Sequence, residues 1–275
     1  MTMIKTVLLG AGGRMGKALI RCLCENRVPD LELAGAVDLW DCPDRGRDAG
    51  LMAGVGECGI PLGSDLASAV SGAQVVIDFS GHKATAGNAP RCAEWGVPMV
   101  IGTTGLSSEE QAVVQSAADR IPIVWAPNMS LGINLLLSLV EQCASALAAR
   151  GYDMEIIERH HRRKKDAPSG TALALGEAAA RGAGWDLAET SVHGRHGDSA
   201  GDRPVKEIGF HAVRAGDFVG DHTVLFSAEG ESVELMHRAT SRDTFALGAL
   251  RAAAWVAAGR KPGLYGMRDV LGLDG

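Results

Sequence analysis

The sequence predicts an α/β protein in which a doubly wound parallel sheet is followed by a second, α+β domain with a mixed or antiparallel sheet. Three observations support this prediction. Short, continuously apolar runs alternate with helical patterns through residue 128, as expected for strands that are covered on both faces. A glycine-rich turn directly follows the first of these runs. After residue 128, long helical patterns give way to strand-like runs that are separated by glycine-containing turns.

The first half is predicted to alternate strands with helices, which is the order of a parallel sheet with helices on both faces. The run VVIDF is typical of a buried strand. The expected strands are 4–9, 32–37, 75–79, 98–101 and 122–125, and the expected helices are 15–26, 84–95 and 107–118.

The second half is predicted to contain a long helix, a strand, another helix and three further strands. Gly216 and Gly230 lie in the turns between the last three strands, so these strands are expected to pair antiparallel. A final helix is expected to return to the first domain and to end the regular structure. The predicted domains are therefore 1–129 with 240–275, and 130–239, joined at two hinge-like crossings. The expected elements are helices at 133–149, from 170 and at 242–258, strands at 152–161, 206–214, 219–228 and 232–238, and a long loop at 181–204.

Composition excludes several classes of protein. The chain has 275 residues, 46% of them hydrophobic, and a net charge of -6, so no overall charge draws it to nucleic acid or to a membrane. No targeting segment is recognised, and the apolar stretch 132–140 stops at Glu141, which is short for a membrane span. The six cysteines are scattered, which is typical of reduced thiols, and we expect a cytoplasmic protein.

The glycine-rich turn has the spacing G-x-x-G-x-x-G, at Gly10, Gly13 and Gly16, rather than the usual G-x-G-x-x-G. It nevertheless joins a strand to a helix, where backbone N–H groups are open to a pyrophosphate. The turn therefore favours a Rossmann-like dinucleotide site over a turn that serves packing alone. Loops after two later strands, 102–105 and 126–130, are expected at the same edge of the sheet, near the nicotinamide.

Asp38 ends the second strand, where a carboxylate accepts hydrogen bonds from the ribose of NAD and repels a 2′-phosphate. Leu39 and Trp40 follow it, and neither is basic. These residues favour NADH over NADPH. Arg14 leaves NADPH open, because its side chain lies beside the glycine turn.

A basic cluster, ERHHRRKKD at 158–166, stands out in this acidic chain. Such a run is often a solvated face. Here it is followed by Ser169, a predicted helix cap, and by Gly170 and Thr171, whose N–H groups lie at the positive end of a helix dipole. Cations that face a helix N-terminus form a site for a carboxylate or a phosphate.

His160 and His161 are adjacent, so in a continued strand they point to opposite faces and do not chelate one metal. One of them, beside Lys164, is a candidate acid or base. His193 and His196 are expected in a solvated loop, and no metal-binding pattern is found in the sequence.

The block ERHHRRKKDAPSGTA resembles the signature of the dihydrodipicolinate reductase family, whose members are also called 4-hydroxy-tetrahydrodipicolinate reductases. The resemblance extends over nearly the whole chain, through GAGGRMG, VIGTTG, APNMSLGIN, GFHAVRAGDFVGDHTV and GLYGMRDVL. It implies an enzyme of diaminopimelate and lysine biosynthesis, an oxidoreductase that reduces a cyclic dicarboxylate with NADH or NADPH. It also implies a homotetramer that associates through the sheets of the second domains.

The resemblance assigns roles to residues. His160 and Lys164 are implied to donate protons, and His161, Gly170 and Thr171 to bind the substrate carboxylates. Leu39 departs from the family pattern, since many relatives have arginine there to hold a 2′-phosphate. The residues implied to bind the cofactor are Gly10, Ala11, Gly12, Gly13, Arg14, Met15, Asp38, Gly102, Thr103, Thr104, Ala126, Pro127, Asn128 and Met129.

Two other functions share some of these features. A different two-domain dehydrogenase, for example one that acts on aspartate, needs the glycine turn and Asp38 but not the block from His160 to Thr171. A redox sensor that binds NAD(H) to control a partner or DNA predicts a DNA-binding helix pair or a broad basic face, and neither is visible in this acidic sequence.

Overall fold

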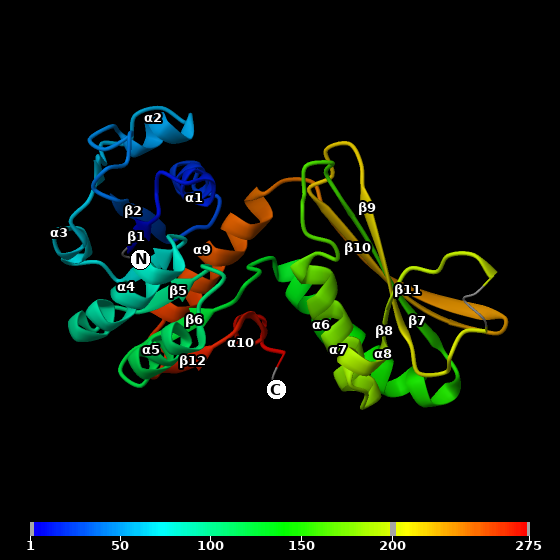
Figure 1. Cartoon of the computed structure of the whole chain (residues 1–275). Coiled ribbons are helices and arrows are strands. Elements are labelled where there is room, and N and C mark those ends of the chain that lie inside the picture. Colours follow the sequence, from blue (N-terminus) through cyan, green and yellow to red (C-terminus); the bar gives the residue numbers. More distant parts are fainter. Residues whose placement is uncertain (1–2, 199–201, 274–275) are drawn as a thin grey trace. The chain divides into compact units, whose positions relative to one another are not determined.

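The computed structural model describes residues 3–198 and 202–273, and it divides into two compact units (Figure 1). The first unit consists of Met1–Leu131 and Asp243–Gly275, and the second of Gly132–Arg242.

The described residues of the first unit form a seven-stranded sheet in the order β12-β6-β5-β4-β1-β2-β3, in which every pair of neighbours is parallel. Continuous apolar runs fill its central strands, as the sequence predicted, because both faces are covered. The strands are β1 (Ile4–Leu9), β2 (Leu31–Val37), β3 (Leu62–Gly63), β4 (Val75–Asp78), β5 (Met99–Ile101), β6 (Pro122–Trp125) and β12 (Gly263–Tyr265).

Helices cover both faces of this sheet, so the predicted doubly wound α/β class is confirmed. On one face, α1, α2, α9 and α10 pack around Leu8 and Ile77. On the other face, α3, α4 and α5 pack around Val76 and Ile101. The helices are α1 (Arg14–Cys24), α2 (Ala49–Ala53), α3 (Leu66–Val70), α4 (His82–Trp95), α5 (Ser108–Ala118), α9 (Asp243–Ala257) and α10 (Met267–Leu271).

The second unit is a five-stranded mixed sheet in the order β11-β10-β7-β9-β8. The helices α6 and α7 lie on one of its faces, where Val140 and Leu175 join the buried residues Ile156 and Phe226 of the strands (Figure 1). The elements are α6 (Leu131–Leu147), η1 (Ala148–Arg150), β7 (Asp153–His160), α7 (Gly170–Ala183), α8 (Leu187–Thr190), β8 (Ser191–His193), β9 (Ile208–Arg214), β10 (Gly220–Ala228) and β11 (Glu231–Ala239).

The expected antiparallel pairing of the last three strands is wrong for β9. This strand pairs in parallel with β7 and β8, whereas β10 pairs antiparallel with both β7 and β11. The segment between β9 and β10 passes over the end of β7, where His161 N donates to Phe218 O and Ala215 N donates to His160 O. A glycine in a turn therefore did not make the two flanking strands neighbours.

Two other expectations about the second half are also wrong. The long loop expected at 181–204 contains the end of α7, α8 and β8, and His193 is a strand residue that stacks on Phe210 at 5.3 Å between ring centroids. The regular structure does not end with α9, because β12 and α10 follow it. Part of the expected loop, 199–201, lies outside the described residues.

One helical stretch among the described residues, Leu131–Arg150, is long and apolar enough to span a membrane by length and composition alone. It is α6 extended by η1. Leu136, Val140 and Ala144 of this stretch are buried in the core of the second unit. A long helix that is packed in a core meets the same criteria of length and composition.

Candidate functional site

The loops that follow the strands of the seven-stranded sheet share one edge, because all of its strands run in parallel. Gly10 follows β1, Asp38 follows β2, Phe79 follows β4, Gly102 follows β5 and Ala126 follows β6. In open α/β sheets, ligands bind beyond these carboxyl ends. The predicted cofactor residues are therefore brought to the edge where such a site is formed.

Glycine is sterically required at the tight positions of the glycine turn. Gly10 has φ +75°, and a Cβ there would lie 2.6 Å from the carbonyl oxygen of Phe79. A Cβ on Gly16 would lie 2.4 Å from the carbonyl oxygen of Gly10. The shifted third glycine therefore allows the first turn of α1 to approach the turn that precedes it, which is the close packing that the usual fingerprint also provides.

Asp38 is held by the glycine turn. Its Oδ2 accepts a hydrogen bond from the N–H of Gly12 at 2.7 Å, and its Oδ1 accepts one from the N–H of Leu39 at 2.8 Å. A Cβ on Gly12 would lie 3.0 Å from Oδ2. The carboxylate is thus fixed at the rim of the turn, and Leu39 beside it has 64% of its surface exposed.

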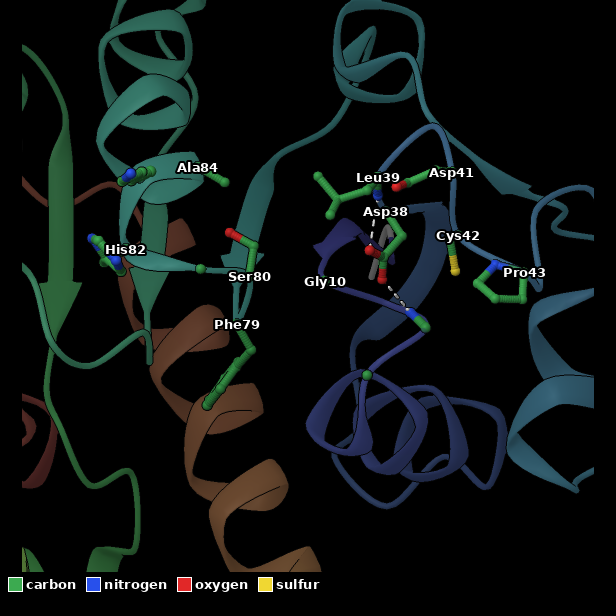
Figure 2. A pocket seen from close by; sticks show the side chains of 14 residues that line it. Gly10, Asp38, Leu39, Asp41, Cys42, Pro43, Phe79, Ser80, His82 and Ala84 are labelled. Carbon is green, nitrogen blue, oxygen red and sulfur yellow. Dashed lines mark hydrogen bonds between the residues drawn. The ribbon is translucent and has the colours of Figure 1, made fainter.

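A pocket of about 860 Å³ opens at this edge. Figure 2 shows the glycine turn with Asp38, Leu39 and the segment 41–43 on one side, and Phe79 to Ala84 on the other. Such a volume lies in the range of small-molecule and cofactor sites. Glycines that leave room for a ligand and a fixed carboxylate beside them fit a dinucleotide, with N–H groups of the turn toward the pyrophosphate and Asp38 toward a ribose.

The remaining predicted cofactor residues differ in what they expose. Arg14 is exposed on the first turn of α1, whereas Met15 packs partly against the core. Thr104 and Pro127 are exposed, and Asn128 Oδ1 accepts a hydrogen bond from the N–H of Ser130 at 2.9 Å. The side chains of Ala11, Thr103, Ala126 and Met129 are buried, so these residues have mainly backbone atoms to offer a ligand.

The loop between β4 and α4 was not among the residues predicted from the sequence. Phe79, Ser80, His82 and Lys83 line the pocket, and the ring of Phe79 would lie 2.2 Å from a Cβ on Gly102. The loop is anchored by the buried carboxylate of Asp78, which accepts hydrogen bonds from the N–H and the hydroxyl of Ser80 at 2.9 and 2.5 Å. The signal was present, since this loop follows a predicted buried strand of a parallel sheet.

A second group of predicted residues gathers in the second unit, where β7 ends and α7 begins. His160 is the last residue of β7 and is buried. Lys164 lies in the segment that follows, with its Nζ 2.8 Å from Asp166 Oδ2 and 22% of its side chain exposed. The N–H of Lys164 donates to the carbonyl oxygen of His161 at 3.0 Å, which makes this segment a tight turn.

The start of α7 has the predicted cap. Ser169 Oγ accepts a hydrogen bond from the N–H of Ala172 at 3.2 Å, and Gly170 and Thr171 are the first two helical residues. Gly170 is exposed, and no atom lies near the position of a Cβ there. The first N–H groups of a helix have no acceptor within the helix and carry its positive partial charge. This end of α7 can therefore bind an anion.

His161 stands among positive charges. Desolvation and the charges of Arg163 and Arg242 lower the pKa of His161. Arg242 was not singled out in the sequence, because it is far from the basic block in the chain. The structure adds its charge to the cluster, and the positive potential is what a dianionic ligand requires.

His160 is held by the buried carboxylate of Glu158, which the sequence indicated only as one of the two acids in the basic cluster. Its Nδ1 lies 2.6 Å from Glu158 Oε2, and Glu158 also receives two hydrogen bonds from Arg214. Burial alone would raise the pKa of Glu158, but the hydrogen bonds from Arg214, His160 and the N–H of Ser169 outweigh it and lower that pKa. Glu158 is therefore ionised at neutral pH.

No group of three or more potential ligands that could hold a metal was found among the described residues. The described residues thus form a pocket beside the glycine turn in the first unit and a cationic cluster in the second. The first has the geometry that suits a dinucleotide, and the second has the charge that suits an anionic ligand.

Comparison with solved structures supports the fold. The structure is similar to the dipicolinate-bound dihydrodipicolinate reductase from Paenisporosarcina sp. TG-14, with a TM-score of 0.75, 24% identity and coverage of 98% of this chain and 99% of that chain. A probable dehydrogenase from Thermotoga maritima is more distant, with a TM-score of 0.59 and 11% identity over 97% of this chain and 92% of its own. Both matches show the same overall fold as this chain.

Comparison of sequences identifies the family. The family model described as dihydrodipicolinate reductase, N-terminus, matches residues 4–129, and the model of the C-terminus matches 132–271. The 4-hydroxy-tetrahydrodipicolinate reductase of Anaeromyxobacter sp. (strain Fw109-5) is 52% identical over 98% of each chain. The enzyme of that name from Halorhodospira halophila is 51% identical over 97% of this chain and 98% of its own. The chain therefore belongs to the dihydrodipicolinate reductase family.

Proposed function

We propose that this oxidoreductase reduces 4-hydroxy-tetrahydrodipicolinate to tetrahydrodipicolinate with NADH or NADPH, in diaminopimelate and lysine biosynthesis. The observation that carries the proposal is the cationic cluster at the end of β7, where Lys164 and the exposed start of α7 stand beside a buried histidine. The names of relatives about 50% identical over almost their whole length support this substrate.

The reaction adds a hydride and a proton to the substrate and releases water, so the site must bind two carboxylates and deliver a proton. Bound reduced nicotinamide supplies the hydride. Gly170 and Thr171, at the positive end of α7, bind one carboxylate through their N–H groups, and His161 contributes at its rim. Lys164 leaves Asp166 to neutralise the substrate, and His160 and Lys164 hold the proton that is transferred.

In the first unit, the glycine turn binds the pyrophosphate of the nucleotide and Asp38 binds a ribose. We propose that NADH is preferred. The carboxylate of Asp38 is fixed by Gly12 and would repel a 2′-phosphate, and Leu39 has no charge with which to bind one. NADPH remains a second cofactor in this proposal, because Lys83 lines the pocket and Arg91 lines a smaller pocket that also includes Asp38 and Leu39.

We further propose a cytoplasmic homotetramer that associates through the second units, with a small dicarboxylate rather than nucleic acid or a membrane as its ligand. The helices cover one face of the five-stranded sheet. On the opposite face, Met236 has 47% and Val213 39% of its surface exposed. Exposed apolar side chains on a sheet face favour association with a second copy.

The proposal is tested by the oxidation of NADH and NADPH with substrate that is generated from pyruvate and aspartate semialdehyde by a coupled synthase. We expect turnover with both cofactors and a higher kcat/KM with NADH. Lys164→Ala should lower kcat/KM by roughly 10²- to 10⁴-fold, the range that a positioned proton donor contributes. Lys165→Ala, which removes an exposed neighbouring charge, should lower it by less than about threefold.

Two results would contradict this proposal in different ways. If neither substitution lowers kcat/KM, the proposed reaction stands but Lys164 has no role in it. Tight binding of NADH without turnover contradicts the reaction itself and favours the sensor considered above.

A further inference from the structure

Glu158 occupies the centre of a hydrogen-bond network in the second unit. Its side chain is 1% exposed and lies on the same face of β7 as His160, two residues further on. Oε2 lies 2.6 Å from His160 Nδ1 and accepts from Arg214 Nη1 at 2.7 Å. Oε1 accepts from Arg214 Nη2 at 2.8 Å and from the N–H of Ser169 at 3.0 Å. One buried carboxylate thus receives four hydrogen bonds.

Each of these donors belongs to a different part of the proposed substrate site. His160 is the proposed proton donor, and Ser169 caps the helix whose first residues bind a carboxylate. Arg214 Nη2 also donates to the carbonyl oxygen of Asp166 at 2.5 Å, so it holds the segment that carries Lys164. These parts come from β7, β9, the start of α7 and the intervening segment, and Glu158 contacts or is linked through Arg214 to each of them.

The network also determines which nitrogen of His160 is presented. An ionised carboxylate has no proton to donate, so Nδ1 must be the donor in the contact with Glu158. In the neutral imidazole, Nε2 is then the bare nitrogen. A Cβ on Gly220 would lie 3.0 Å from Nε2, so the absence of a side chain there leaves room beside this atom.

We propose that Glu158 is a positioning residue for the proposed reduction. It fixes His160 as the Nδ1–H tautomer, stabilises the protonated imidazole and keeps the start of α7 and the Lys164 segment in place through Ser169 and Arg214. The arrangement has the same logic as the buried aspartate of a catalytic triad, which orients a histidine and stabilises its charge without itself reacting. The inference rests on the proposed function, since it takes His160 as a proton donor.

The test is Glu158→Gln, which retains the shape of the side chain and removes its charge. Glu207→Gln is the matched control, because Glu207 is also buried and paired with an arginine, at 2.5 Å from Arg195 Nη2, but has no contact with His160 in the structure. Both variants are compared with the wild type in the coupled assay across pH 5–9, and folding is checked by circular dichroism.

We expect Glu158→Gln to lower kcat by roughly 10²-fold, the lower end of what general acid–base catalysis contributes, while KM for NADH changes by less than about twofold. Glu207→Gln should keep the wild-type kcat. Equal effects of both variants, or an unchanged kcat in Glu158→Gln, would overturn the proposal.

A measurement on the wild-type protein decides the same question if Glu158→Gln does not fold. The nitrogen spectrum of histidine-labelled protein, with His160 assigned by the signal that His160→Gln removes, reports which ring nitrogen carries hydrogen. We expect Nδ1–H in the neutral form. A neutral His160 with Nε2–H would overturn the inference, whether or not the enzyme turns over the proposed substrate. Absence of wild-type turnover would instead contradict the proposed function alone.

Discussion

His222 provides a quantitative prediction about stability. Its side chain is buried on β10, with Nε2 at 3.2 Å from Ser169 Oγ, and burial followed by the nearby charge of His160 lowers its pKa from 6.5 to about 4. The unfolded chain therefore binds a proton between about pH 6.5 and pH 4 that the folded chain does not bind. Stability is then lost as the pH falls through this window, and below pH 4 this histidine adds no further dependence.

The magnitude follows from the shift of about 2.5 pH units. At 1.36 kcal/mol per unit, acidification from pH 7 to pH 4 should cost the wild type about 3 kcal/mol through His222. The neighbouring groups Glu158, His160, Asp221 and His237 also titrate or carry charge, so the comparison must be made with a variant. His222→Gln places a side-chain amide near the position of Nε2 and removes the titratable imidazole.

The assay is urea unfolding of both proteins at pH 7, 6, 5 and 4. Unfolding is monitored through the hydrogen exchange of the β7 and β10 amides, so that the free energy measured is that of the second unit. We expect the wild type to lose about 3 kcal/mol more than His222→Gln over this range. Parallel pH dependences of the two proteins would refute the reasoning, as would a directly titrated pKa of His222 close to 6.5.

Three further predictions concern the first unit. Leu39→Arg should raise the ratio of kcat/KM for NADPH to kcat/KM for NADH by roughly tenfold in steady-state assays, which corresponds to about 1.4 kcal/mol. An unchanged ratio would show that the 2′-phosphate lies elsewhere. Gly16→Ala should destabilise the protein by about 1–3 kcal/mol in urea unfolding, since its Cβ would lie 2.4 Å from the oxygen of Gly10; wild-type stability would show that the turn relaxes freely. Burial raises the pKa of Cys92 to about 12, so iodoacetamide at pH 8 should label it only after denaturation, as mass spectrometry can check; rapid labelling of native protein would contradict this.

Local sequence predicted the longer elements of the first unit because their signals are local, but it did not predict the short elements α2, β3, α3 and α10. The strand before Gly10 and the helix after Gly13 are specified by a continuous apolar run and a glycine turn, all within the first 24 residues of the chain. The short strand β12 was missed, because Gly263–Tyr265 has no alternation of its own and is a strand only through its pairing with Pro122–Val124 of β6. Tertiary pairing of this kind leaves no periodic pattern in the sequence.

The order of the second sheet could not be predicted for a related reason. The turn that contains Gly216 is compatible with a hairpin of β9 and β10, but β7 lies between these two strands. The position of a strand in a sheet depends on which of its faces is buried, rather than on the turn that precedes it. Here Met154 and Ile156 of β7 are buried against α6 and α7.

For the candidate site, the sequence indicated the chemistry of the basic block and the cap at Ser169, because both depend on residue types close together in the chain. It did not indicate the role of Glu158. An acid in a charged run normally faces solvent. Only the register of β7 with β9, which places Arg214 opposite His160, shows that this acid is buried and paired.

The proposed substrate site is tested most directly by whether the cluster of Lys164 and the start of α7 binds a dicarboxylate. Calorimetric titration with dipicolinate, in the presence of NADH, would be carried out on the wild type, Lys164→Ala and the control Lys165→Ala. We expect Lys164→Ala to weaken binding by at least about tenfold and Lys165→Ala to bind as the wild type does. Equal affinity of all three proteins would contradict the assignment of the dicarboxylate site.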